Sequence, residues 1–289
     1  MSVSFTEGSV YELLRRDPNL AFDPHVAHAG LIYDAEARAQ LERVHCAYAS
    51  IAKDAGLPVV LQTDTWRASR DRVRASGLPE TINEDNVAFL RGIWPGATVL
   101  GLMGPRGDAY QPTEALSEED AEEYHSWQAE RLIGANLLMA ATLPALSEAR
   151  GLAKAMGASG KPFILSFVVR ASGHLLDGNS LSSAVQSIDS LELPPKMYAL
   201  NCVHPDVASE ALQNTDASVR HRIRWLQANA SKMSPEELDN SQELRTSDPD
   251  EWATAMLRVA REFHLQVLGG CCGTDAEHIR SLVKKYRVR

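Results

Sequence analysis

Three cysteines in the second half of this 289-residue chain are candidates for metal chemistry. Cys202 lies at the end of an apolar run, and Cys271 and Cys272 are adjacent within the glycine-rich segment 269–274. Three thiolates that converge could bind zinc tetrahedrally and leave the fourth position open, which is typical of catalytic zinc. Neighbouring residues on a regular strand point to opposite faces. We therefore expect the glycines at 269, 270 and 273 to let the backbone turn both adjacent sulfurs toward one ion.

The same pattern has other interpretations. The three cysteines could be unrelated buried residues, because Cys-Cys is not the usual Cys-x-x-Cys zinc motif. The glycine-rich turn could hold a phosphate on the first amides of the following helix, although the acidic Asp275 stands at that position. Cys271 and Cys272 could form a redox-active pair, which leaves Cys202 unexplained. The fourth cysteine, Cys46, lies inside an amphipathic segment and is expected to be a small buried hydrophobe.

Short apolar runs alternate with longer amphipathic segments along the chain. The apolar runs predict strands buried on both faces at residues 59–65, 98–104, 135–142, 163–169, 197–203, 223–229 and 265–271, with a weaker run at 3–6. The amphipathic segments predict helices at residues 34–55, 71–91 with a break near Gly77, 117–133, 145–158, 181–191, 205–213, 249–263 and 275–286. Asp34 and Ser117 are the expected N-terminal caps of two of these helices. The polar segment 229–248 predicts a long loop with a short helix at 235–238.

This alternation predicts an α/β fold in which residues 1–289 form a single (β/α)8 barrel of the TIM type. The strands recur every 30 residues or so, roughly the size of a βαβ unit. An open doubly wound sheet is the alternative, but no Gly-x-Gly-x-x-Gly follows the first predicted strand. Active-site groups of such a barrel lie at the C-terminal ends of its strands. We therefore expect Cys202, Cys271 and Cys272 on that one face.

Other polar or aromatic side chains at the predicted strand ends are candidates for binding substrates. They are Glu7, Asp64, Thr65, Trp66, Asp108, Thr142 and Asn201. The aromatic face of Trp66, Tyr110 or Trp127 could bind a cation by cation–π attraction, although each could instead be a packing residue. His204 either supports a metal bound to Cys202 or is a loop histidine before Pro205.

The composition limits the partners and the location. The formal net charge of −9 argues against nucleic acid and anionic membranes, both of which select basic patches. The N-terminus has no signal-peptide pattern, and no apolar run is long enough to span a membrane. Four cysteines in a chain of this length argue against a disulfide framework. We expect a cytoplasmic protein that acts on small molecules, with no nucleic-acid or membrane partner, and a homo-oligomer is compatible with the sequence.

The pair Asn201-Cys202, together with Gly269-Gly270-Cys271-Cys272-Gly273-Thr274, resembles the homocysteine S-methyltransferase family. Weaker similarities are Thr65-Trp66-Arg67-Ala68-Ser69 to the family's Thr-aromatic-x-Ala-Ser turn, Gly104-Pro105-Arg106-Gly107 to its Gly-Pro-x-Gly loop, and the stretch 161–178. The resemblance covers residues 1–285. It implies a (β/α)8 barrel, a zinc ion on Cys202, Cys271 and Cys272, and methyl transfer from an onium donor to homocysteine, which gives methionine.

Two positions depart from the family pattern. The first strand of the family usually ends in Asp-Gly-Gly, whereas this chain has Thr6-Glu7-Gly8-Ser9. After the fourth strand the family usually has Glu-Thr, and its Glu helps to hold the amine of the acceptor; here the matching pair is Ala141-Thr142. The resemblance therefore implies a retained metal centre and an altered amino-acid pocket. Methylation of a thiol other than homocysteine is the alternative.

Zinc held by thiolates suits alkyl transfer. A free thiol has a pKa of about 8.5, and its thiolate is the form that attacks a methyl group on sulfonium or ammonium. Bound zinc fixes the thiolate form, and three cysteine ligands give the centre a net negative charge, so the bound sulfur keeps its electron density. The sequence thus predicts a zinc-dependent methyltransferase with a small thiol acceptor and an onium donor. A zinc hydrolase on the same barrel and a non-catalytic zinc- or thiol-binding protein are the alternatives.

Overall fold

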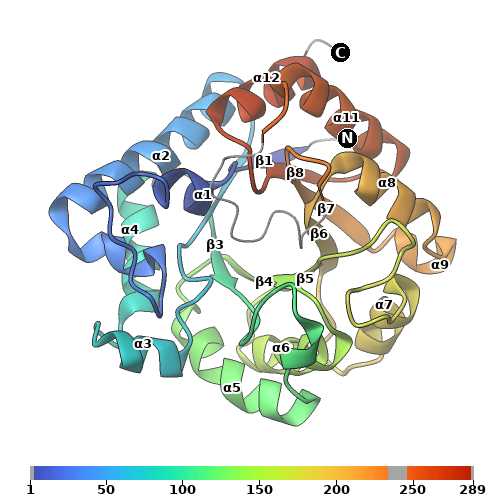
Figure 1. Ribbon diagram of the computed structural model, residues 1–289, viewed down its shortest axis with the longest axis horizontal. Helices are drawn as coiled ribbons and strands as arrows, with labels where there is room; N and C mark the ends of the chain where they lie inside the picture. Colours follow the sequence, from blue (N-terminus) through green and yellow to red (C-terminus); the bar gives the residue numbers. More distant parts are fainter. Residues whose placement is uncertain (1–2, 234–245, 288–289) are drawn as a thin grey trace.

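The computed structural model describes residues 3–233 and 246–287, and within them eight parallel strands close into a barrel in chain order (Figure 1). The strands are β1 Ser4–Thr6, β2 Val59–Gln62, β3 Thr98–Met103, β4 Leu137–Leu143, β5 Phe163–Phe167, β6 Met197–Val203, β7 Ile223–Ala228 and β8 Val267–Gly270. The short strand β1 closes the barrel because it pairs with β2 on one side and with β8 on the other. The predicted (β/α)8 barrel is confirmed, including its weak first strand.

Helices surround the barrel and connect its strands (Figure 1). They are α1 Val10–Leu14, α2 Ala35–Asp54, α3 Arg70–Ser76, α4 Ile82–Ile93, α5 Glu118–Arg131, α6 Leu146–Ala158, α7 Leu181–Asp189, α8 Pro205–Gln213, α9 Ala217–Arg220, α11 Pro249–Glu262 and α12 Ala276–Arg287, with 3-10 turns η1 His28–Tyr33 and η2 Pro112–Glu114. The predicted caps are confirmed, since Asp34 accepts from the amides of Glu36 and Ala37 and Ser117 from that of Asp120. Gly77, in the left-handed region at φ 71°, ends α3 at the predicted break.

The sequence analysis missed the short elements α1, α9, η1 and η2. Each has between three and six residues, which is too few for a hydrophobic period to show. The short helix predicted at residues 235–238 lies outside the described residues. No helix in the described part of the chain has both the length and the apolar character that crossing a membrane requires.

Two layers of apolar side chains form most of the core. One cluster comes from the strands alone and fills the inside of the barrel: Val60, Leu100, Met139, Ala141, Ile164, Ala199, Trp225 and Val267. The larger cluster joins the outward faces of the strands to the helices. The barrel is therefore plugged by side chains, and a ligand can approach only from an end. Ala141 belongs to the inner cluster and also lines the cavity described next, so it forms part of the cavity floor.

Candidate active site

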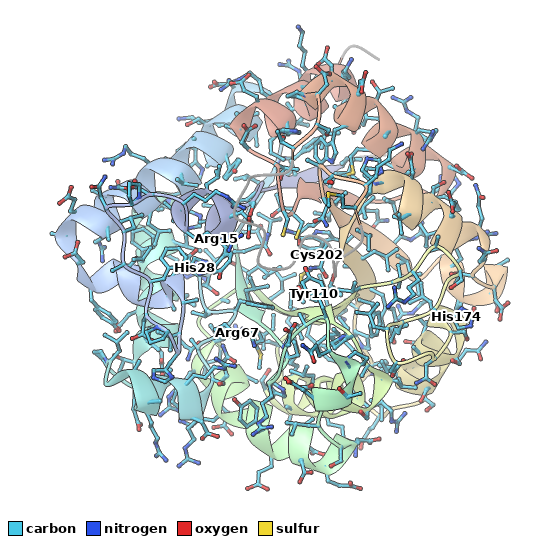
Figure 2. All side chains as sticks on the ribbon, in the orientation of Figure 1. Arg15, His28, Arg67, Tyr110, His174 and Cys202 are labelled. Carbon is cyan, nitrogen blue, oxygen red and sulfur yellow. The ribbon has the colours of Figure 1, made fainter. Side chains whose placement is uncertain are left out.

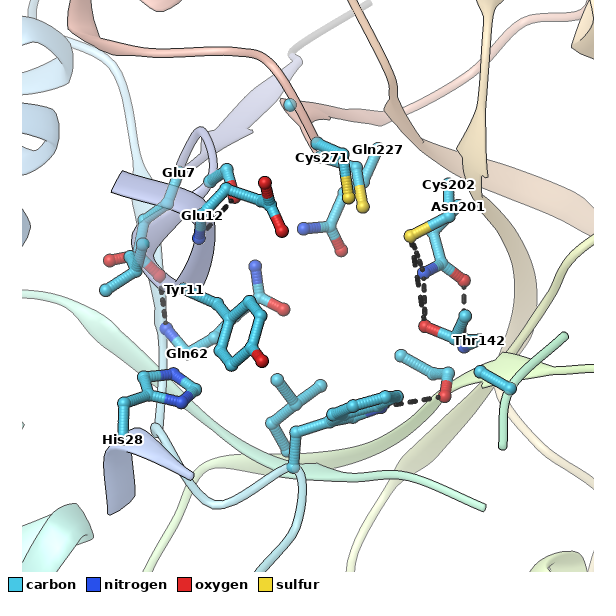
Figure 3. A pocket seen from close by; sticks show the side chains of 18 of the residues that line it. Glu7, Tyr11, Glu12, His28, Gln62, Thr142, Asn201, Cys202, Gln227 and Cys271 are labelled. Carbon is cyan, nitrogen blue, oxygen red and sulfur yellow. Dashed lines mark hydrogen bonds between the residues drawn. The ribbon is translucent and has the colours of Figure 1, made fainter. Parts of the chain in front are cut away.

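The sulfur atoms of Cys202, Cys271 and Cys272 converge at the C-terminal end of the barrel. Cys202 is in β6 and the other two follow β8, yet all three Sγ atoms lie within 4.8 Å of one another. Figure 3 shows the sulfurs on one side of the central cavity, with Cys202 and Cys271 labelled. A Zn–S bond is about 2.3 Å long, so one ion among the three sulfurs could bind all of them. The donor set and its spacing therefore fit a zinc ion.

The backbone at these cysteines is irregular. Cys202 has a φ of 55°, in the left-handed region that residues other than glycine seldom adopt, and the pairing of β6 with β7 shifts register between Asn201 and Val203. After β8 the chain turns, and the amide and the hydroxyl of Thr274 both donate to the carbonyl of Cys271, at 3.2 and 2.7 Å. Irregular backbone of this kind is common where side chains must be aimed at a site.

The glycines beside the paired cysteines act differently from our expectation. Only Gly273 has a positive φ, 80°. Gly269 and Gly270 are required because space is lacking. A Cβ at 269 would lie 2.2 Å from Cγ2 of Thr6, and one at 270 would lie 2.0 Å from Oγ1 of Thr274. The end of β8 therefore lies so close to β1 and to the turn at Thr274 that no side chain fits at positions 269 and 270.

Asn201 and Thr142 hold Cys202 in place. Asn201 Nδ2 donates to Cys202 Sγ at 3.3 Å and to Thr142 Oγ1 at 2.8 Å. Its Oδ1 accepts from the amide of Thr142 and from the hydroxyl of Ser166. Thr142 has a φ of 65°, and its hydroxyl lies 4.0 Å from the same sulfur. All the polar atoms of the Asn201 side chain are thus committed to orienting the β4 and β6 ends around this cysteine.

Proximity makes the three thiols unequal. Hydrogen bonds from Cys271 and Cys272 hold the pKa of Cys202 well below its ordinary value, although burial opposes this. The hydrogen bonds to Cys202 raise the pKa of Cys271 and of Cys272, and burial raises both further. A thiolate in this cluster is thus stabilised by the hydrogen bonds of its neighbouring thiols.

The amides at the start of α12 are occupied, which excludes the phosphate interpretation. Asp275 Oδ1 accepts from the amides of Glu277 and His278, at 2.9 and 3.2 Å, and lies 2.8 Å from Nδ1 of His278. An anion would compete with this carboxylate for the same amides.

A cavity of about 400 Å³ opens beside the three cysteines. Six of the seven predicted substrate residues line it: Glu7, Asp64, Trp66, Asp108, Thr142 and Asn201. Thr65 does not, because its hydroxyl donates to the carbonyl of Leu102 at 2.7 Å and bonds to Thr63. In Figure 2 the labelled Arg15, His28, Arg67, Tyr110 and Cys202 lie around the centre of the barrel seen end-on, whereas His174 lies at the periphery.

The candidate aromatic residues fall into two groups. Trp66 and Tyr110 line the cavity, and Trp66 donates from Nε1 to the carbonyl of Ala141 at 3.2 Å. Burial and the neighbouring cysteines raise the pKa of Tyr110 well above its ordinary value, so this phenol stays neutral. Trp127 instead packs on the small apolar cluster around Val26 and Ile82, outside the cavity. Trp127 is therefore a packing residue rather than a cation-binding residue of the cavity.

Two further candidates have structural roles. His204 caps α8 by accepting from the amide of Asp206 at 3.1 Å, and burial lowers its pKa to about 4. It does not line the cavity, so the loop interpretation applies.

Cys46 is half-buried on α2 rather than fully buried as expected, because its helix position is at the edge of the apolar face.

A buried network of two carboxylates and two histidines, which the sequence analysis missed in part, forms one wall of the cavity. His45 of α2 contacts Glu7 Oε1 through Nδ1 and lies 3.0 Å from Asp64 Oδ2 through Nε2. His28 of η1 lies 3.1 Å from the other oxygen of Asp64. The second oxygen of Glu7 accepts from the amide of Gln62 at 2.7 Å. Both carboxylates therefore already have strong partners.

The charges of this network are interdependent. Burial alone would lower the pKa of His45, but Glu7 and Asp64 raise it well above its ordinary value. Burial alone would raise the pKa of Asp64, but His45 and His28 hold it below its ordinary value. Burial raises the pKa of Glu7 despite the adjacent imidazolium. His45 is therefore a buried cation between two acids.

Other cavity residues that the sequence analysis missed come from α1 and from the C-terminal ends of β2 and β7. Figure 3 shows Tyr11, Glu12, Gln62 and Gln227 around the same cavity as the cysteines. Glu12 is paired with Arg15 at 2.9 Å and also contacts Arg16. The position of α1 directly after β1, at the C-terminal face, was the available signal, because loops on that face form the sites of such barrels.

Comparisons with known proteins agree on one family and one fold. The family model described as homocysteine S-methyltransferase matches residues 7–286. The chain is 30% identical over 135 residues to a methionine synthase of Mycobacterium leprae (strain TN), a match that covers 46% of this chain and 11% of that protein. It is 33% identical over 134 residues to a homocysteine S-methyltransferase of Escherichia coli (strain K12), which covers 43% of this chain and 40% of that protein. The matches thus span less than half of these two relatives.

Solved structures show the same fold. The homocysteine methyltransferase MmuM from Escherichia coli, in its metallated form and in its oxidized form, superposes with a TM-score of 0.75 at 23% identity. Each superposition covers 99% of this chain and 96% of that protein.

Proposed function

The chain belongs to the homocysteine S-methyltransferase family, and from this premise we propose that it is a zinc-dependent enzyme that moves a methyl group from a sulfonium or ammonium donor to a thiol. Homocysteine, which would give methionine, is the leading acceptor. The observation that carries the proposal is the convergence of three cysteine sulfurs within 4.8 Å of one another at the edge of a cavity of about 400 Å³. A cavity of this volume suits small molecules.

Cys202, Cys271 and Cys272 would hold the zinc ion, which when bound supplies the acceptor as a thiolate at neutral pH. In the transfer the acceptor sulfur forms a bond to the methyl carbon as the bond from that carbon to the donor sulfur or nitrogen breaks. The bonding pair stays on the donor atom, which becomes neutral, and the proton of the thiol is released beforehand. Asn201 and Thr142 support this chemistry by fixing the orientation of Cys202.

The onium group would bind among aromatic and acidic side chains of the cavity. Tyr110 lines the cavity near the cysteines and is neutral, so its ring could bind a cation there. Trp66 can offer only one face, because the guanidinium of Arg67 covers the other at 4.3 Å from the ring centroid. Asp108 adds a carboxylate on the same cavity. We assign Tyr110 and the open face of Trp66 to the donor.

The acceptor pocket has few free carboxylates for an amino group. Ala141 replaces the family's Glu, and Glu7 is engaged by His45 and by the amide of Gln62. The loss of one charged hydrogen bond to an ammonium costs about 1.5–3 kcal/mol. That is about ten- to a hundredfold in affinity. A thiol that lacks the amine is therefore the main rival of homocysteine.

Methyl transfer by the zinc-loaded protein tests the proposal. Homocysteine and 3-mercaptopropionate would each be assayed with S-methylmethionine, S-adenosylmethionine and betaine, using the wild type and Ala141→Glu. We expect turnover with at least one donor and a gain with homocysteine in the variant. Efficient use of homocysteine by the wild type with no gain in the variant would show that the amine is held elsewhere. If no thiol is methylated from any donor while zinc stays bound, the non-catalytic binding protein replaces the enzyme.

A further inference from the structure

We infer that Arg67 binds a carboxylate of a substrate that enters the cavity, which makes it a determinant of specificity. This inference rests on the proposed function and adds the chemical class of the substrate to it. Arg67 follows Trp66 in the segment after β2, is half-buried and lines the cavity. It stands at the variable position of the Thr-aromatic-x-Ala-Ser pattern, so the pattern itself does not require an arginine there.

One edge of the Arg67 guanidinium is fixed and the other edge is unoccupied. Nη1 donates to the carbonyl of Gly107 at 2.6 Å, with the carbonyls of Pro105 and Arg106 at 3.4 and 3.5 Å. The guanidinium carbon lies over the indole of Trp66, 4.3 Å from the ring centroid. Within residues 3–233 and 246–287, Nε and Nη2 have no hydrogen-bond partner. A guanidinium held by stacking and by one nitrogen presents its two remaining donors in the geometry that a carboxylate accepts.

In the described part of the protein, Arg67 forms no ion pair with a carboxylate. No carboxylate there lies within 4.0 Å of its nitrogen atoms. Asp108, on the same cavity, instead accepts from the amide of Tyr110 at 2.8 Å. An arginine stays charged even when half-buried. The carbonyl of Gly107, the ring of Trp66 and the charge of Asp108 offset part of its desolvation, and a ligand carboxylate would add a direct ion pair.

The other arginines on the cavity are already engaged. Arg15 and Arg16 both bind Glu12, and Arg16 also donates to the carbonyl of that residue at 2.9 Å. Among the described residues, Arg67 is thus the cavity arginine without a carboxylate within 4.0 Å, while the carboxylates Glu7, Asp64 and Glu12 have basic partners. A ligand carboxylate would complement Arg67, whereas a ligand ammonium at Glu7, Asp64 or Glu12 would have to displace a basic partner.

A short chain of contacts connects Arg67 to the cysteine end of the cavity. The stacked Trp66 donates to the carbonyl of Ala141, and the hydroxyl of the next residue, Thr142, lies 4.0 Å from Cys202 Sγ. Both a thiol acceptor and an onium donor of amino-acid type could carry the carboxylate. The chemistry at Arg67 is the same for either, and the experiment separates the two.

Matched substrates with and without a carboxylate test the inference. The acceptors would be 3-mercaptopropionate and 1-propanethiol, and the donors S-methylmethionine and trimethylsulfonium, with wild type, Arg67→Met, Arg67→Lys and Arg72→Met. Arg72 is the matched control, because it also donates to the carbonyl of Arg106, at 3.1 Å, but does not line the cavity. It reports the effect of weakening the 105–107 loop alone.

We expect Arg67→Met to raise the KM of one carboxylate-bearing substrate about ten- to a hundredfold and to leave its carboxylate-free match unchanged. The KM of Arg67→Lys for that substrate should lie between those of the wild type and Arg67→Met. Arg72→Met should have the same effect on the KM of the carboxylate-bearing substrate as on that of its match. The substrate whose KM changes identifies the source of the carboxylate. Equal effects on both members of both pairs, or a wild type without preference for a carboxylate, would overturn the inference.

Calorimetric titration of the zinc-loaded protein with the same four compounds keeps this test separate from the proposed function. Suppose that the wild type shows no turnover but binds a carboxylate-bearing compound more tightly than its carboxylate-free match, and that Arg67→Met abolishes this difference in affinity. The enzyme proposal then fails and the Arg67 site stands. If turnover occurs and Arg67→Met leaves the preference for carboxylate-bearing compounds unchanged, the Arg67 site is wrong and the enzyme proposal stands.

Discussion

Asn201 donates from Nδ2 to the sulfur of the next residue, Cys202, at 3.3 Å. Consecutive side chains of a regular strand point to opposite faces and do not meet. Cys202 has a φ of 55°, which breaks this alternation, so its sulfur lies on the same side as the Asn201 side chain. The same amide group reaches Thr142 across the barrel end, so a single side chain ties the β4 and β6 ends to one metal-ligand candidate.

Replacement of Asn201 should therefore weaken metal binding without removing a ligand. We expect Asn201→Ala to lower zinc affinity about ten- to a hundredfold, since partners that orient a ligand typically contribute that much. Competition with a chelator measures the affinity. Asn214→Ala is the control, because Asn214 is exposed and its amide donates to the carbonyl of Ala171. Equal zinc affinity in both variants would contradict the role of Asn201.

His45 should make stability depend on pH above neutrality. The fold raises its pKa well above the ordinary value, so between the unfolded and folded pKa values the folded protein keeps a proton that the unfolded chain releases. The stabilisation is complete below about pH 6.5 and is lost as the pH rises through the folded pKa, by at most about 1.4 kcal/mol per pH unit.

Denaturant unfolding between about pH 7 and 9 measures this dependence. We expect His45→Gln to be less stable than the wild type by about 3–5 kcal/mol, because the change leaves the buried Glu7 without a basic partner and Asp64 with His28 alone. The variant should also lose the part of the pH slope that His45 contributes. His221→Gln, at an exposed histidine, should keep the wild-type slope. Parallel stability profiles for His45→Gln and the wild type would be inconsistent with a protonated His45.

The turn at the paired cysteines should not tolerate even a methyl group. A Cβ at position 270 would lie 2.0 Å from Oγ1 of Thr274, whose hydroxyl holds the Cys271 carbonyl. We expect Gly270→Ala to cost about 1–3 kcal/mol and to reduce zinc content together with stability. Gly96→Ala, at a glycine with nothing within 4 Å of its Cβ, should affect neither. A stable, fully metallated Gly270→Ala protein would show that the turn can adjust.

The sequence predicted the barrel and most of the pocket because both follow from strand order. Apolar runs located the eight strands, and their C-terminal ends contained Cys202, Asp64 and Thr142 without any tertiary information. The same rule misplaced Thr65, since adjacent residues at a strand end face different directions and only the fold decides which of them meets the cavity.

What the sequence could not predict depends on contacts between distant elements. His45 occupies an ordinary buried position of a long helix, and only the packing of α2 on the barrel brings it between Glu7 and Asp64. The glycines at 269 and 270 were attributed to backbone freedom, yet they are required by the approach of Thr6 and Thr274. The sequence did not predict a role for Arg67 either, because the role follows from its contacts with Trp66 and Gly107 and from its place on the cavity.

The zinc content of the reduced, purified protein is the most direct test of the central claim that Cys202, Cys271 and Cys272 bind the catalytic metal. Elemental analysis should find about one zinc per chain in the wild type and in Cys46→Ser, which changes the half-buried cysteine on α2. Cys202→Ser, Cys271→Ser and Cys272→Ser should each lose most of the metal while remaining folded by circular dichroism. Zinc at the wild-type level in any of these three variants would contradict the ligand assignment and, with it, the proposed chemistry.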